Sequence, residues 1–327
     1  MSVFRTPLTV SKSSVLITVN HAILTVGSCF SDMLGNQLTK NKFKVSVNPF
    51  GAIYNPVSLH KALRYTIYNE LPMPATYLEK DGIFSNYDFH SSFSREDQRS
   101  LEEGIKDVTG FNHFFLKDCD HLIVTYGTAW VHERVDTKEI VANCHKLPSQ
   151  KFSKRLLNPE SVTTSFDELY RELKSFNPRI KIILTVSPVR HTRETLELNS
   201  VSKAILRLAC HTLSETHSDV DYFPAFEIQL DDLRDYRFYA SDMIHPSPDA
   251  EKYIWEKFTQ TYFDEASLHF LEQWSKVQTA LTHKAFHPRS AAHQRFLNDT
   301  LQILLELKSK VNVDSEINFV QHQLNHL

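Results

Sequence analysis

The sequence predicts a three-layer α/β fold, in which helices cover both faces of a parallel β-sheet. Five short runs rich in Val and Ile have the length of strands and no polar alternation, which is typical of strands buried on both faces. They lie at residues 22–26, 44–47, 121–126, 180–186 and 222–226. Segments with helical spacing separate them, at residues 32–41, 56–68, 166–175, 192–216 and 248–258. Strands that alternate with helices predict βαβ units and hence a parallel sheet.

Two stretches do not follow this alternation. Residues 71–110 mix aromatic residues, serines and charges, and we expect an insertion there, as an irregular lid or a short hairpin. From about residue 263 onward the spacing is helical only. The sequence therefore predicts an α/β domain over residues 1–262 and a helical extension over residues 263–327. This extension packs on the domain or forms a homodimer contact.

The composition indicates in which compartment the protein works and which partners it does not favour. The chain has 327 residues and a formal net charge of -3, with Lys and Arg scattered, which favours neither nucleic acid nor an acidic membrane. Its first residues lack the apolar core of a signal peptide, and no run reaches the ~18 apolar residues of a membrane span. The four cysteines are far apart, which is typical of reduced thiols. We therefore expect a soluble, cytoplasmic protein.

Glycine is scarce in this chain, and its placement indicates where a ligand binds. Of only 7 glycines, Gly27, Gly51 and Gly127 directly follow apolar runs. Glycine suits positions where the backbone has a positive φ or approaches a ligand closely. In an open parallel sheet, ligands bind at the carboxyl ends of the strands. The three glycines therefore indicate a binding site at this edge, although structural turns would also use them.

Ser28 directly follows the first predicted strand and opens the next helix. Its hydroxyl would lie at the strand's carboxyl end, where the first amides of the helix and the helix dipole favour an anion. Acyl transfer to a serine needs such donors, because an oxyanion forms in the transition state. Serine is also a preferred N-cap residue, so a capping role is the simpler reading of this position alone. Cys29 offers a cysteine mechanism as a further alternative.

Asp242 and His245 form a second candidate element. Three residues apart and just before a helix, they can lie side by side, so that the carboxylate orients the imidazole. Ser247 and Pro248 are a good N-cap and first helical residue, which puts His245 in the preceding loop. An early serine with late Asp and His is one known order for a catalytic triad on an α/β sheet.

Together these residues resemble the GSCFA family, a branch of the SGNH/GDSL-type hydrolase superfamily. The matching segments are GSCF at 27–30, NPFG at 48–51, YGTAW at 126–130, NCHK at 143–146, SPVRH at 187–191 and DYRFYASDMIHPS at 235–247. The final Ala of the name motif is Ser31 here. The resemblance implies a flavodoxin-like α/β/α fold, with Ser28 as nucleophile and Asp242 and His245 as the other triad members.

The chain departs from the wider superfamily at its oxyanion hole. There the third strand ends in a glycine that is shortly followed by an asparagine, whereas Gly127 is followed by Thr128, Ala129 and Trp130. We expect the amides of Ser28 and Gly51 to be donors. A side chain would supply a third donor, and the options are Thr128, Asn48 and Asn143, with Asn143 preferred.

Other polar and aromatic residues near the predicted strand ends have either a substrate-binding or a structural role. The substrate-binding candidates are Thr128, Trp130, His145, Arg190 and His191. The spacing suggests no metal site, and no cofactor is expected.

The sequence thus predicts a serine esterase that acts through an acyl-enzyme on a small-molecule or carbohydrate ester. Three alternatives stay open: an acyltransferase with the same site, a metal-dependent phosphoesterase, and an inactive binding protein on the hydrolase scaffold. The phosphoesterase would use Asp242, His245, Asn143 and His145 as ligands.

Overall fold

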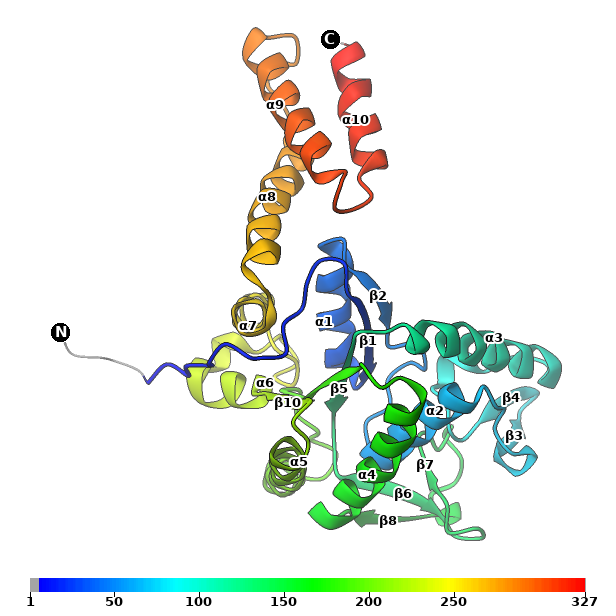
Figure 1. Ribbon diagram of the computed structural model, residues 1–327. Helices are drawn as coiled ribbons and strands as arrows, with labels where there is room; N and C mark the ends of the chain where they lie inside the picture. The colour runs from blue at the N-terminus through cyan, green and yellow to red at the C-terminus, as the bar shows by residue number, and fades with distance from the viewer. Residues whose placement is uncertain (1–5, 327) are drawn as a thin grey trace.

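A five-stranded parallel sheet forms the centre of the protein in this computed structural model, which describes residues 6–326 (Figure 1). Its strand order is β10 (Val220–Phe223), β9 (Lys181–Val186), β5 (His121–Tyr126), β1 (Ala22–Gly27) and β2 (Lys44–Val47). All neighbouring strands pair in parallel. The predicted three-layer α/β fold is confirmed. The last strand begins two residues earlier than predicted and ends at Phe223, because Pro224 follows it.

Helices cover the two faces of this sheet, because alternate residues of each strand belong to different cores. Ile23 of β1 packs with α1 (Cys29–Lys40) and α7 (Pro248–Tyr262), whereas its neighbour Leu24 packs on the opposite face. That second face is covered by α2 (Pro56–Tyr68), α3 (Gln98–Lys117), α4 (Pro159–Phe176) and α5 (Leu196–Thr216). A short helix, α6 (Ala225–Glu227), follows β10.

The topology fixes where a ligand can bind. After β1 the chain forms β2 on one side of it, then crosses to form β5 on the other side. In open α/β sheets, ligands bind outside the carboxyl ends of the strands where the order reverses in this way. Gly27 ends β1 beside Thr125 of β5, so Ser28, the next residue, lies at this switch point.

The insertion and the segment after β5 contain structure that the sequence analysis did not resolve. Residues 71–110 include the hairpin β3 (Tyr77–Lys80) and β4 (Ile83–Asn86), but their last part is the beginning of α3, which is a core helix. A small antiparallel sheet was not predicted. It has the order β7 (Ile140–Val141), β6 (Trp130–Arg134) and β8 (Phe152–Leu156). Its strands are short and largely half-exposed, so they lack an apolar run.

The chain ends in three helices that project from the α/β domain: α8 (Glu265–Thr282), α9 (Ala291–Leu307) and α10 (Asp314–Asn325) (Figure 1). They have an apolar core of their own. The Trp274 indole donates to the Lys40 carbonyl at 2.9 Å, at the C-terminal end of α1. These helices therefore contact the end of α1 opposite to Ser28. Within residues 6–326, no helix is long and apolar enough to cross a membrane.

Candidate active site

Ser28 lies at the point where β1 passes into α1, and the residue before it must be glycine. Gly27 has a φ of +134°, and a Cβ there would lie 2.1 Å from the Thr125 carbonyl oxygen. The Ser28 side chain makes no capping hydrogen bond to α1. Its Oγ is buried and has no hydrogen-bond partner among the described residues. The geometry therefore gives no support to a capping role, and leaves a free hydroxyl at the switch point.

Asp242 and His245 form a tight pair in the loop before α7. Asp242 Oδ2 lies 2.7 Å from His245 Nδ1, and Oδ1 accepts from the His245 and Ile244 amides at 3.0 and 2.9 Å. The two amide hydrogen bonds and the His245 ring lower the pKa of Asp242 to about 2. The carboxylate is therefore ionised at neutral pH, and it holds the imidazole in one orientation.

Arg190 braces this loop. Its guanidinium lies 3.8 Å from the centre of the Tyr239 ring and donates to the Met243 carbonyl at 3.3 Å. Its amide also donates to the Ile244 carbonyl at 3.2 Å. Met243 has a positive φ of 59°, an uncommon conformation for a side chain of this kind. Arg190 thus holds both main-chain carbonyls between Asp242 and His245.

His245 reaches the first turn of α1, where its ring contacts the thiol of Cys29. His245 Nε2 lies 3.6 Å from Cys29 Sγ, and Ser28 is the preceding residue. Burial raises the pKa of the Cys29 thiol, and the nearby Asp32 carboxylate raises it further. The thiol therefore resists ionisation here. The structure brings Ser28, Asp242 and His245 to one place, with the imidazole turned toward the thiol.

The two main-chain amides expected to bind an oxyanion are already occupied. The Ser28 amide donates to the Thr125 carbonyl at 3.1 Å, and the Gly51 amide donates to the Asn48 carbonyl at 2.8 Å. The Gly127 amide is occupied as well, by the Tyr54 carbonyl at 2.9 Å. None of these three is free to receive an oxyanion in this conformation.

Asn48 supplies a side-chain donor at the same edge. Its Oδ1 accepts from the Gly27 amide at 3.0 Å, so its amide nitrogen Nδ2 is the side-chain group that can donate to a ligand. This Nδ2 is buried and makes no hydrogen bond of normal geometry among the described residues. It nevertheless lies near Asp32. Burial raises the pKa of that carboxyl, and the Asn48 amide opposes the rise.

Asn143 and His145 have other partners. The Asn143 amide donates to the Tyr87 carbonyl at 3.1 Å, and its Oδ1 accepts from the His145 amide. His145 Nε2 lies 2.7 Å from the Asn86 carbonyl oxygen. These contacts join the loop after β7 to the end of β4, and none of them reaches Ser28. The preference for Asn143 as third donor is therefore not supported, and the geometry favours Asn48.

Helix α5 holds the loops at this edge through buried polar residues that the sequence analysis missed. Ser202 Oγ accepts from the Ala129 amide at 2.8 Å and lies 3.0 Å from Thr128 Oγ1. Lys203 is fully buried, and its Nζ donates to the Gly127 and Ser187 carbonyls, both at 2.7 Å. The sequence signal for a buried role of Lys203 was its place among the apolar positions of a predicted helix.

Thr128 and His191 lie in these loops, and Trp130 begins β6. Thr128 Oγ1 accepts from the Trp130 amide at 3.1 Å, while Lys154 covers the Trp130 ring. The His191 amide donates to Asn199 Oδ1 of α5 at 2.9 Å, and its ring packs edge-on against Tyr54. His191 Nε2 and Ser28 Cβ both lie close to Gly127, so His191 is a predicted substrate-binding residue that the structure brings near Ser28.

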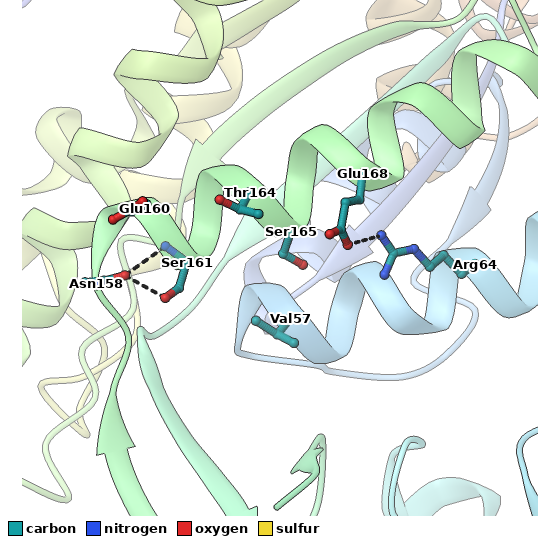
Figure 2. A pocket seen from close by; sticks show the side chains of 8 residues that line it. All are labelled: Val57, Arg64, Asn158, Glu160, Ser161, Thr164, Ser165 and Glu168. Carbon is teal, nitrogen blue, oxygen red and sulfur yellow. Dashed lines mark hydrogen bonds and ion pairs between the residues drawn. The ribbon is translucent and has the colours of Figure 1, made fainter.

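A surface groove between α2 and α4 is separate from this constellation (Figure 2). Arg64 pairs there with Glu168 at 3.0 Å, and Asn158 caps α4 through Ser161. Its lining contains none of Ser28, Asp242 and His245. Among residues 6–326, no group of three or more His, Cys, Asp or Glu side chains could hold a metal ion.

The fold and this edge of the sheet define an α/β protein with a serine and an Asp–His pair at the carboxyl ends of its central strands. The chain belongs to the GSCFA family, whose model matches residues 22–258. A model described as GSCFA domain protein, C-terminal domain, matches residues 274–326. No curated protein sequence matches the chain significantly.

Solved structures resemble the chain at low identity. A Streptococcus pneumonia protein described as a candidate platelet activating factor is 10% identical over 74% of this chain and 83% of its own, with a TM-score of 0.39. A carbohydrate esterase family 2 enzyme from Corynascus thermopiles is 11% identical over 81% and 69%, with a TM-score of 0.38. A carbohydrate esterase family 3 structure from Talaromyces cellulolyticus is 10% identical over 77% and 98%, with a TM-score of 0.35.

Proposed function

We propose that the protein is a serine hydrolase that cleaves carboxylic esters through an acyl-enzyme. One observation carries this proposal: the Asp242–His245 pair lies against the first turn of α1, where the Ser28 hydroxyl is buried and has no partner among the described residues. A free hydroxyl, an oriented imidazole and a buried polar edge are the parts that acyl transfer to serine requires.

The reaction begins with a proton transfer. His245 Nε2 takes the proton of Ser28 Oγ while the oxygen forms a bond to the ester carbonyl carbon. The protonated imidazole then gives this proton to the departing alkoxide, which leaves as an alcohol. Water repeats the sequence on the acyl-enzyme and releases the acid. Asp242 stays ionised throughout, because its hydrogen bonds hold its pKa at about 2.

One local movement is needed. His245 Nε2 now faces Cys29 Sγ, so the ring must turn from one residue of the first helical turn to the preceding one. Catalytic hydrogen bonds are often long before substrate binds, and they tighten in the complex. His245 is about half exposed, which leaves its ring room to turn.

The oxyanion must be met by donors, and the structure favours side chains for this role. The Asn48 amide nitrogen is buried and, beyond its interaction with the Asp32 carboxyl, makes no hydrogen bond to the described residues, while the Gly27 amide fixes its orientation through Oδ1. We therefore assign Asn48 as an oxyanion donor, in place of the Ser28 and Gly51 amides. The N-terminus of α1 adds a favourable potential for the negative charge.

A cysteine mechanism is the second candidate, and the contact between Cys29 and His245 favours it. The nucleophile would then be a thiolate, which a histidine partner normally stabilises. At this site, however, burial and Asp32 both raise the pKa of the thiol. Serine needs no prior ionisation, since His245 removes its proton during attack. Ser28 is therefore the preferred nucleophile.

Hydrolysis of p-nitrophenyl acetate by the wild type, Ser28→Ala and Cys29→Ala tests the proposal. We expect turnover by the wild type and by Cys29→Ala, and none above background by Ser28→Ala. Loss of turnover in Cys29→Ala alone would establish the cysteine mechanism instead. Product analysis with an added alcohol then shows whether the acyl group goes to water or to the acceptor.

A further inference from the structure

Ser28 and His191 both lie close to Gly127, which has no side chain. A Cβ placed on Gly127 would lie 3.2 Å from Ser28 Cβ and 3.2 Å from His191 Nε2. Ser28 Cβ and His191 Nε2 are therefore at most twice that distance apart. Gly127 has no positive φ, so its lack of a side chain serves close packing: a Cβ would also lie 3.1 Å from Tyr54 Cδ1, and these neighbours would have to move apart.

His191 places an unpaired ring nitrogen close to Gly127. Its Nε2 is buried, and no hydrogen-bond partner for it exists among the described residues. A buried polar atom without a partner costs free energy, and such atoms are rare unless a ligand or water completes them. Asn199 fixes the main chain of His191 by accepting from its amide, and Tyr54 packs against the ring in a T-shaped contact.

The distances suit an oxyanion. An oxygen on a carbon that is bonded to Ser28 Oγ lies about 3 Å from Ser28 Cβ, and its donors lie about 2.7–3.1 Å beyond it. The upper limit that Gly127 sets on the distance between Ser28 Cβ and His191 Nε2 allows this arrangement. Asn48 accepts from the amide of Gly27, the residue before Ser28, so it is a second donor candidate at this edge.

We infer that His191 Nε2–H donates a hydrogen bond to the oxyanion formed at Ser28, and that His191 is a catalytic residue. This inference rests on the proposed function. It explains how the chain acts without an asparagine after Gly127, since His191 reaches the same space from the loop after β9.

The charges around His191 agree with a neutral donor. Burial, followed by the nearby basic side chains of Lys203, Arg193 and His245, lowers the pKa of His191 to about 3. The ring is therefore neutral at physiological pH and in acid well below it. A neutral imidazole that donates through Nε2 does not compete with His245 for the proton of Ser28.

Three variants test the assignment. His191→Phe keeps the ring and its contact with Tyr54 but removes the donor, and His191→Gln restores an N–H near the position of Nε2. His121→Phe is the matched control, because His121 likewise has a buried ring nitrogen, Nδ1, without a partner among the described residues, and burial lowers its pKa to about 4. It begins β5 at the end of the strand remote from Gly127.

The rate of Ser28 labelling by a fluorophosphonate and the kcat and KM for p-nitrophenyl acetate are measured for each. We expect His191→Phe to lose about 100- to 1000-fold in kcat and in labelling rate with little change in KM, and His191→Gln to recover part of the loss. His121→Phe should stay within a few-fold of the wild type. The nitrogen NMR shifts of His191 should show Nε2–H and no titration between pH 5 and 8.

Each other result overturns a separate claim. If His191→Phe is labelled and turns over like the wild type, the assignment of His191 is wrong and the serine hydrolase stands. If His191 carries its proton on Nδ1, or titrates near neutrality, the assignment is also wrong. If well-folded wild type is neither labelled nor active, the proposed function is wrong, and the role of His191 is wrong with it.

Discussion

Lys203 should make the stability of the protein rise with pH between about 7 and 10. The side chain is fully buried, and burial lowers its pKa to about 7 from 10.5. Its two recorded acceptors are the carbonyls of Gly127 and Ser187, which a neutral amine with two N–H groups can satisfy. Below pH 7 both the folded and the unfolded chain carry the proton, so the folded state bears the full cost of a buried charge. Above pH 10.5 neither carries it, and the cost is gone.

The size of this effect follows from the shift in pKa. Between pH 7 and pH 9 the unfolded chain keeps the proton while the folded chain releases it, which is worth about 2 kcal/mol of stability in the wild type. Lys203→Met keeps the length of the side chain and removes both the charge and the two donors. The two carbonyls then lose their partner, at a cost of about 1–3 kcal/mol each.

Urea denaturation of the wild type and Lys203→Met at pH 7, 8 and 9 measures the difference in free energy of unfolding. Subtraction of the two proteins cancels the titration of the tyrosines and cysteines that they share. We expect the advantage of the wild type over Lys203→Met to grow by about 2 kcal/mol across this range. A difference that is independent of pH would refute the reasoning, because Lys203 would then have the same charge in both states.

Three further predictions concern the site and its backbone. Asp242→Asn should lower kcat by about 10⁴-fold in p-nitrophenyl acetate hydrolysis, since the amide favours the wrong imidazole tautomer; a loss under tenfold would contradict the triad. Arg190→Ala should reduce kcat more than KM by loosening the Asp242–His245 loop, and an unchanged kcat would exclude a bracing role. Gly27→Ala should abolish folding, whereas Gly82→Ala should cost only the strain of its positive φ, about 1–2 kcal/mol in thermal unfolding, because only at Gly27 does a Cβ meet a carbonyl oxygen; equal effects would contradict this account.

The sequence predicted those parts of the fold and site that depend on local pattern. The strands of the central sheet are continuous apolar runs, and both Ser28 and the Asp242–His245 pair lie within short motifs. Asp and His three residues apart meet through the geometry of a single turn, which needs no knowledge of the remaining chain. For the same reason, the loop before α7 was placed correctly from Ser247 and Pro248 alone.

The parts that escaped prediction depend on contacts between distant segments. Lys203 and Ser202 of α5 bind the loop after β5, more than seventy residues earlier, and only their place on an apolar helical stripe marked them. The sequence could not show that the Gly51 amide is used by Asn48, nor that Asn143 bonds to the hairpin. The β6–β8 sheet escaped because its half-exposed strands have no apolar run.

The identity of the nucleophile is the central claim, and covalent labelling tests it most directly. Wild type, Ser28→Ala and Cys29→Ala are treated with a fluorophosphonate and analysed by intact mass, with cysteines blocked beforehand. We predict one adduct on the wild type and on Cys29→Ala, and none on folded Ser28→Ala. An adduct that persists in Ser28→Ala, or no adduct on folded wild type, would contradict the assignment of Ser28.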